Sequence, residues 1–113
     1  MLTDKTKNDF EKYFIIKIRH REDIGERYFD ENLLDSLYTA DLTLQLAYAL
    51  DFFDTKGIFI YIDSIQSQDN RGWRFHIHQV GLDNVRENEY GSSREYITIK
   101  AIEKANEIYN STK

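Results

Sequence analysis

A glycine at position 57 divides the two clearest periodic patterns in this chain. Before it, five apolar side chains recur at helical spacing and predict one buried helix face: Leu42, Leu46, Ala49, Leu50 and Phe53. After it, residues 58–65 alternate as a strand does, and both faces of that strand are apolar. We therefore predict a central strand that is covered on both sides. Glycine suits the left-handed position that ends a helix, so we expect a helix at 41–56 that passes directly into this strand.

A second alternating segment follows at residues 73–80. Three of its side chains are expected to face the core and three to face outward: Trp73, Phe75 and Ile77, and Arg74, His76 and His78. The polar residues 66–72 between the two segments predict a turn, and the pair predicts an antiparallel hairpin. Since two strands alone are marginally stable, we expect a third strand at residues 14–20, which hold a β-branched run. Helical spacing from Phe10 to Ile18 leaves a helix as the alternative there.

Helices are expected to pack this sheet. The patterns predict them at about residues 3–13, 41–56 and 93–110, with a short helical turn at 30–38. At residues 39–46, alternating apolar side chains leave a strand as the alternative. Ser92 and Glu95 have the spacing of a capping box, and residues 81–91 have the composition of a polar loop. The predicted fold class is α+β, a small antiparallel sheet with helices packed on it, in a single domain that spans residues 1–113.

The composition excludes several kinds of site. The chain has no cysteine, which excludes disulfides, thiolate nucleophiles and cysteine-ligated metals. Its five glycines are dispersed rather than grouped in a phosphate-binding loop, and no serine lies in a nucleophile elbow. We therefore expect no enzyme and no cofactor. The polar N-terminus has no apolar signal core, and the longest apolar run is far shorter than the ~20 residues of a membrane span. A cytoplasmic protein without a membrane partner is expected.

Charge is concentrated in the middle of the chain. The net charge is −5, and residues 22–54 carry nine acidic side chains against one basic side chain. Residues 1–21 carry six basic and three acidic side chains, whereas residues 55–113 are balanced. Because the acidic segment repels phosphate, direct nucleic-acid binding is not the activity we expect. The segment suits a basic partner, or a solvated face with no partner.

Two stretches of the sequence carry a resemblance. Residues 52–58 read Phe-Phe-Asp-Thr-Lys-Gly-Ile, and residues 101–110 read Ala-Ile-Glu-Lys-Ala-Asn-Glu-Ile-Tyr-Asn. Together with the Ser-Arg-Glu at residues 93–95, they resemble a loose group of small phage and mobile-element proteins from Bacteroidetes. The resemblance covers residues 42–110 and implies no catalytic residue. The N-terminal third, with its basic and acidic segments, departs from the group.

The resemblance implies a phage or mobile-element context, in which a small acidic protein can inhibit a host defence nuclease. We therefore expect a non-catalytic protein-binding module, an inhibitor of the anti-CRISPR type. Its carboxylates would occupy the basic channel of a nucleic-acid-guided nuclease, where phosphates normally bind. Exposed tyrosines among charged residues are typical of protein-binding surfaces. The expected partner-binding residues are Glu26, Tyr28, Asp30, Glu31, Asp35 and Tyr38.

One alternative function is metal binding. His76 and His78 are two residues apart in a predicted strand, so their imidazoles share a face. This spacing suits two ligands of one Zn²⁺ or Fe²⁺. His20 could supply a third ligand if residues 14–20 pair beside this strand, and Asp63 lies on the neighbouring strand. The same two histidines could equally be exposed side chains without a metal.

A second alternative is a nucleic-acid accessory module. Arg71 and Arg74 flank Trp73, and His76 and His78 follow on the same predicted strand. An aromatic ring beside arginines can stack on bases while the guanidinium groups bind phosphates. Against this function, the alternation places Trp73 on the inward face of the hairpin.

Overall fold

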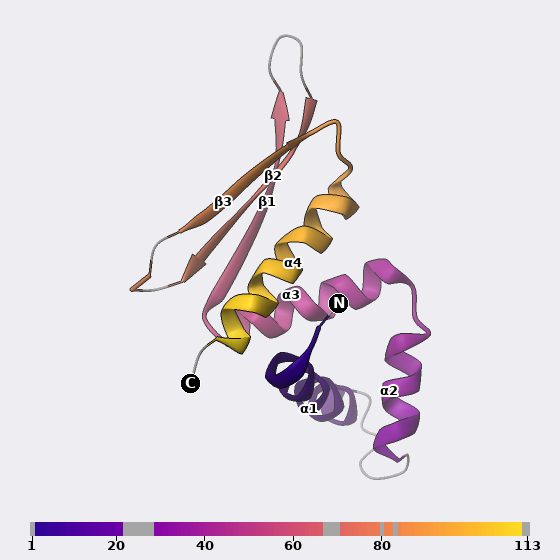
Figure 1. The fold of residues 1–113 in the computed structure, drawn as a ribbon. Helices are drawn as coiled ribbons and strands as arrows, with labels where there is room; N and C mark the ends of the chain where they lie inside the picture. The colour runs from indigo at the N-terminus through magenta and orange to yellow at the C-terminus, as the bar shows by residue number, and fades with distance from the viewer. Residues whose placement is uncertain (1, 22–28, 67–70, 80, 83, 112–113) are drawn as a thin grey trace.

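The computed structural model describes residues 2–21, 29–66, 71–79, 81–82 and 84–111. These residues form four helices and three strands (Figure 1). In chain order they are α1 Asp4–Arg21, α2 Asp30–Tyr38, α3 Leu42–Thr55, β1 Ile58–Gln66, β2 Arg71–Gln79, β3 Val85–Tyr90 and α4 Arg94–Asn110. The architecture is α+β, as the sequence predicts, with helices packed on a three-stranded antiparallel sheet.

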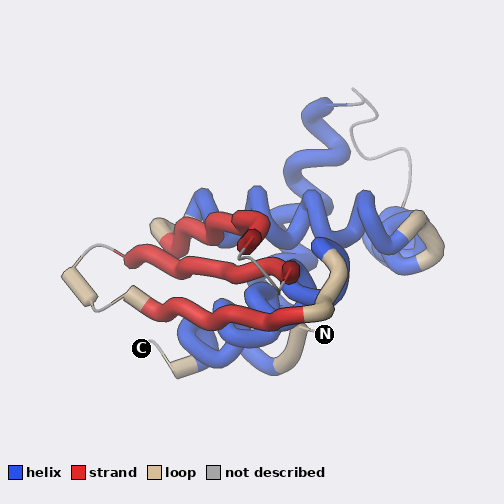
Figure 2. The backbone as a smooth tube through the Cα atoms, turned by 90° about the horizontal axis from the view of Figure 1, so that it is seen from above, coloured by secondary structure: helices blue, strands red, loops and turns tan. Residues whose placement is uncertain are grey.

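The sheet has the order β1-β2-β3, and each strand is antiparallel to its neighbour. Ile60 lies opposite Ile77 and Ile62 lies opposite Phe75, so apolar side chains gather on one face. Both α3 and α4 pack against β1, and α4 also packs against β2. Figure 2 shows the helices on one side of the three strands. In the described part of the chain, no helix covers the other face, which we call the open face.

The junction between α3 and β1 follows the sequence pattern. Gly57 has a φ of 75°, in the left-handed region that a residue without a Cβ adopts at no steric cost. The chain therefore leaves the helix and enters the strand within two residues. Phe52 and Phe53 are fully buried just before this turn. The helical prediction for residues 41–56 is confirmed, and the alternative strand at 39–46 is wrong.

An aromatic cluster joins three of the helices. The ring of Phe52 on α3 lies 5.6 Å from that of Phe10, 5.5 Å from that of Tyr13 and 5.5 Å from that of Tyr109, measured between centroids. The planes of these rings meet at angles between 56° and 78°, in the tilted and edge-to-face range that aromatic pairs prefer. Because these rings come from α1, α3 and α4, the three helices share one core.

The first turn of α1 is bound by side chains from the far end of the chain. The backbone N–H of Thr3 donates to Oδ1 of Asn106, and that of Thr6 donates to Oδ1 of Asn110, both at 2.9 Å. Amides in the first turn of a helix have no intrahelical acceptor, so these bonds stabilise the start of α1. The two asparagines of the motif at residues 101–110 thus have a structural role.

The third strand does not lie where the sequence pattern predicts it. Residues 14–20 belong to α1, which continues to Arg21 instead of ending near residue 13. Phe10 and Phe14, one helical turn apart, are both buried, so the packing of this helical face outweighs the β-branched run. The third strand is instead β3, within the segment 81–91 that the composition predicts as a polar loop. The alternative of a helix at residues 10–18 is the correct one.

Two smaller predictions are also corrected. β1 is an edge strand, and Tyr61 on its outer face is 52% exposed, so this strand is neither central nor covered on both sides. The cap of α4 is Ser93 rather than Ser92, because Oγ of Ser93 accepts from the N–H of Tyr96 at 3.1 Å. The predicted hairpin is confirmed, with strands Ile58–Gln66 and Arg71–Gln79. The helix predicted at 93–110 is confirmed as α4.

Candidate functional site

α2 carries four of the expected partner-binding residues: the acids Asp30, Glu31 and Asp35, and Tyr38. Leu33 and Leu37 are buried, which turns the opposite side of the helix toward solvent. Glu31, Asp35 and Tyr38 are all exposed, and their spacing of four and then three residues places them in one row along the helix. We call these three residues the α2 stripe.

Asp30 differs from the α2 stripe in its contacts. Its Oδ1 accepts from Nη2 of Arg19 on α1 at 2.7 Å, an ion pair that links the start of α2 to α1. The carboxylates of Glu31 and Asp35 have no hydrogen bond or ion pair within the described part of the chain. α2 itself contains no basic residue, so two like charges one helical turn apart repel each other.

Tyr38 connects the α2 stripe to α1. Its hydroxyl donates to Oε2 of Glu11 at 2.8 Å, while the side chain stays 47% exposed. Partial burial, and then the hydrogen bond to the Glu11 carboxylate, raise the pKa of Tyr38 well above its ordinary value. The phenol therefore stays neutral and keeps donating over the whole physiological pH range.

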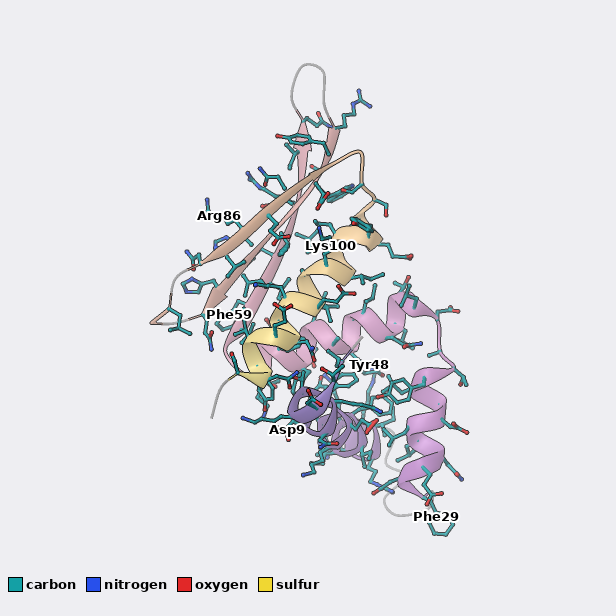
Figure 3. All side chains as sticks on the ribbon, in the orientation of Figure 1. Asp9, Phe29, Tyr48, Phe59, Arg86 and Lys100 are labelled. Carbon is teal, nitrogen blue, oxygen red and sulfur yellow. The ribbon has the colours of Figure 1, made fainter. Side chains whose placement is uncertain are left out.

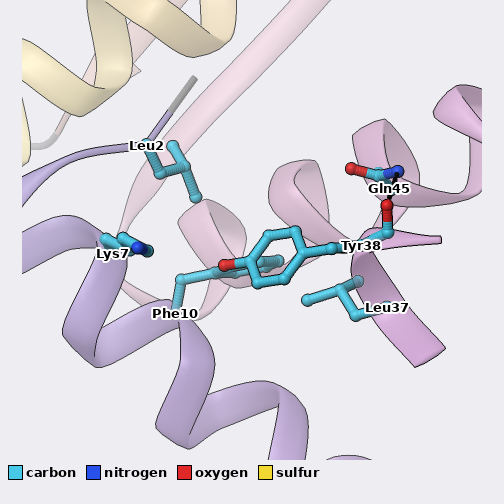
Figure 4. A pocket seen from close by; sticks show the side chains of 6 residues that line it. All are labelled: Leu2, Lys7, Phe10, Leu37, Tyr38 and Gln45. Carbon is cyan, nitrogen blue, oxygen red and sulfur yellow. Dashed lines mark hydrogen bonds between the residues drawn. The ribbon is translucent and has the colours of Figure 1, made fainter. Parts of the chain in front are cut away.

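A groove of about 350 Å³ lies beside Tyr38, between α1, α2 and α3 (Figure 4). The side chains that line it are Leu2, Lys7, Phe10, Leu37, Tyr38 and Gln45. The amide of Gln45 donates to the carbonyl of Ala40 at 2.8 Å, which fixes the corner between α2 and α3. Because Tyr38 belongs both to the groove and to the α2 stripe, an apolar side chain in the groove would lie next to the acidic row.

Phe29 is a feature of this surface that sequence reasoning missed. It precedes α2 directly and is 77% exposed (Figure 3). An aromatic side chain with that exposure is a usual anchor for a protein partner. In the sequence, Phe29 stands between a tyrosine and the first acidic residues of α2, and this position could have indicated that it belongs to the same surface. Glu26 and Tyr28, which the sequence also assigns to this surface, lie outside the described residues.

The residues of the metal-binding hypothesis are not brought together. His76 and His78 do share the open face, with ring centroids 6.5 Å apart. His20, however, lies on the last turn of α1, which packs against the other helices. Asp63 lies on β1, in an ion pair of 3.5 Å with a neighbouring arginine. Across the described ranges, no group of three side chains is placed to hold a metal ion.

The residues of the nucleic-acid hypothesis lie on two different faces. In the strand register, Arg71 and Trp73 fall on the same side of β2 as the buried Phe75. The half-buried Trp73 packs there beneath Arg94 of α4, whose guanidinium carbon is 5.8 Å from the ring centroid. Arg74 points to the open face, together with His76 and His78. Trp73 and Arg71 therefore cannot form one platform with Arg74.

Comparisons of the chain with models of protein families, with curated proteins and with solved structures find no match. The resemblance to phage and mobile-element proteins therefore stays a prediction. Among the described residues, every helix is too short or too polar to cross a lipid bilayer. The function must accordingly be argued from the surfaces of this chain alone.

Proposed function

We propose that this chain is a non-catalytic protein-binding module that docks through the α2 stripe. The observation that carries the proposal is the pair Glu31 and Asp35, which are exposed, repel each other and form no ion pair in the described part of the chain. The macrodipole of the helix favours an acid in the first turn, but Asp35 lies beyond that turn. A basic partner would relieve the repulsion between the two carboxylates.

The surroundings of the α2 stripe define the chemistry of the partner. Lysine and arginine side chains could place their aliphatic stems over the groove beside Tyr38 and their charges at Glu31 and Asp35. Phe29 and Tyr38 provide aromatic contacts at the two ends of α2. Opposite charges of this kind raise the association rate and make binding sensitive to salt.

The basic guide or target channel of a host nucleic-acid-guided nuclease has this partner chemistry. A phage or mobile-element context, implied by the resemblance, favours such a target. In this proposal the protein competes with nucleic acid for the channel and acts as an inhibitor of the anti-CRISPR type. The carboxylates of Glu31 and Asp35 would then take positions that phosphates occupy in the active nuclease.

Charge reversal on the α2 stripe tests the proposal. The test variant carries Glu31→Lys and Asp35→Lys, and the matched control carries Asp54→Lys and Glu103→Lys, which make the same change in net charge at exposed positions of α3 and α4. Each tagged protein is used to capture partners from a lysate of the host bacterium, with nuclease present to remove nucleic acid. Circular dichroism verifies that both variants are folded.

Wild type and control are expected to retain one stoichiometric protein partner, and the test variant is expected to lose it. Rising salt should weaken the retained complex, because exposed charges are screened. Absence of any retained protein, or equal retention by both variants, contradicts the proposal. If the partner is a guided nuclease, its cleavage should fall as the purified protein is added, and unchanged cleavage would rule out the inhibitor assignment.

A further inference from the structure

The open face of the sheet carries aromatic and basic side chains in register. In one row across the three strands, Tyr61 lies opposite His76, and His76 lies opposite Arg86. In the adjacent row, Asp63, Arg74 and Asn88 occupy the same strands. Figure 3 shows Arg86 on the side of the sheet that points away from α4. The face therefore carries rings and guanidinium groups side by side rather than an apolar patch.

Two tyrosine rings of this face are exposed to solvent, and the other rings are half-buried beside them. Tyr61 is 52% exposed and Tyr90 is 54% exposed, one on each edge strand. The ring of Tyr61 is 5.8 Å from that of His76, and the half-buried ring of Phe59 stacks at 6.5 Å on that of His78. Nε2 of His76 is covered and has no hydrogen-bond partner in the described part of the chain. The face thus offers the exposed π surfaces of Tyr61 and Tyr90 to a ligand, whereas Nε2 of His76 lies beneath the surface.

The carboxylates of β3 do not reach this face. Glu87 and Glu89 lie on the opposite side of the strand, where Lys100 of α4 forms ion pairs with both. The open face keeps Arg74 and Arg86 against a single carboxylate, Asp63, among its described side chains. Asp63 pairs with Arg74 at 3.5 Å, so Arg86 is the guanidinium group of this face that has no carboxylate partner in the described part of the chain. The face therefore has a small positive excess on a chain whose net charge is −5.

We propose that the open face binds single-stranded nucleic acid. Exposed tyrosine rings beside arginines are the combination that single strands require, because unpaired bases stack on the rings while phosphates bind the guanidinium groups. A duplex keeps its bases stacked inside and offers no base face to Tyr61 or Tyr90. An acidic protein surface would satisfy Arg86 but would leave the rings without stacking partners.

This site is separate from the α2 stripe and does not depend on the function proposed for that surface. It also differs from the hairpin site that the sequence suggested, since Trp73 and Arg71 take no part in it. The contributing residues come from all three strands: Phe59 and Tyr61 from β1, Arg74 and His76 from β2, and Arg86 and Tyr90 from β3.

Fluorescence anisotropy with labelled strands tests the proposal. The probes are oligo-dT and oligo-rU of about 15 nucleotides, with a duplex of equal length as a competitor, at low salt. The test variants are Tyr61→Ala and Arg86→Glu, both at exposed positions. Their matched controls are Tyr96→Ala, a half-exposed tyrosine on α4, and Lys12→Glu, an exposed lysine on α1.

The expected result is binding of one or both single strands, weakened about tenfold by Tyr61→Ala, the size of one lost stacking contact. Arg86→Glu should weaken binding and reduce its salt dependence by about one phosphate contact. The controls should bind as the wild type does. If neither strand binds, if the duplex competes equally, or if the controls lose as much affinity, the proposal fails. A dimer that dissociates on Tyr61→Ala, measured by light scattering, would assign the face to a second copy of this chain and overturn it.

Discussion

At the scale of single residues, Tyr109 couples the packing of the helices to pH. The side chain is 8% exposed, and its hydroxyl donates to Oδ2 of Asp9 at 2.5 Å, which links α4 to α1. Burial, and then the hydrogen bond to Asp9, raise the pKa of Tyr109 to about 12. A tyrosine in the unfolded chain titrates near 10. Between these two values the unfolded chain loses a proton that the folded protein keeps, so the free energy of unfolding falls as pH rises.

Urea unfolding across the range from about pH 9 to pH 12 measures this effect. We expect Tyr109→Phe to be less stable than wild type at neutral pH, because it loses a hydrogen bond to a charged acceptor. Its free energy of unfolding should then fall less steeply with pH, by up to roughly 1.4 kcal/mol per pH unit. Asp9→Asn keeps the ring and removes the carboxylate, so its slope should lie between the other two. If the free energy of unfolding falls equally steeply with pH in wild type and in Tyr109→Phe, Tyr109 is not the source of the pH dependence.

At the scale of elements, α1 depends on α4 for the capping of its first turn. Oδ1 of Asn110 accepts both from the backbone N–H of Thr6 at 2.9 Å and from its hydroxyl at 2.7 Å. Replacing a capping side chain with alanine typically costs about 1 kcal/mol, and we expect Asn110→Ala to lower the free energy of unfolding by that amount. Asn110→Asp keeps the acceptor and should lose less. Urea unfolding gives the size of the loss, and hydrogen exchange at the Thr6 amide gives its location.

The matched control for this prediction is Asn32→Ala. Asn32 lies exposed on α2, and its side chain has no hydrogen bond to the described part of the chain. Alanine is the better helix former, so the control should be neutral or slightly stabilising. An equal loss in Asn32→Ala and Asn110→Ala would mean that the contact between α4 and α1 adds no stability beyond helix propensity.

The elements also show which parts of the fold a sequence pattern can predict. The helix at 41–56 and the hairpin were predictable because one apolar face decides each of them. β3 was not, since its covered face holds Val85 with Glu87 and Glu89, and the two glutamates are tolerated there because Lys100 binds them from α4. That compensation depends on a residue 11 positions after Glu89, so no local alternation signals the strand. For the same reason the open face, which needs β3, could not be assembled from the sequence.

The α2 stripe was accessible to sequence reasoning because it needs one helix only. Once residues 30–38 are helical and the leucines face inward, the positions of Glu31, Asp35 and Tyr38 follow from helical spacing. The ion pair between Asp30 and Arg19 could not be predicted, since it depends on how α1 and α2 meet. Neither could the failure of His20 to join His76 and His78, because that hypothesis required residues 14–20 to be a strand.

At the scale of the whole molecule, the two proposed surfaces are separated along its length. The Cα positions extend 55 Å along the longest axis, and Figure 1 shows the sheet and α2 toward opposite ends, with α1, α3 and α4 between them. The α2 stripe is acidic and repels phosphate, whereas the open face holds Arg86 without a carboxylate partner among the described residues. This separation would let one chain bind a protein partner and a single strand at the same time.

The separation predicts that the two surfaces act independently at physiological salt. Charges there are screened over about 8 Å, a small fraction of the distance between the ends of the molecule. The variant with Glu31→Lys and Asp35→Lys should therefore bind oligo-dT within about twofold of the wild-type affinity at about 0.15 M salt. Near 0.01 M salt the screening length grows to about 30 Å, and the same variant should bind the strand more tightly. If the affinity of the variant for oligo-dT changes severalfold at about 0.15 M salt, the two surfaces are coupled through the structure. If this affinity is unchanged at both salt concentrations, the bound strand lies beyond the reach of the α2 charges.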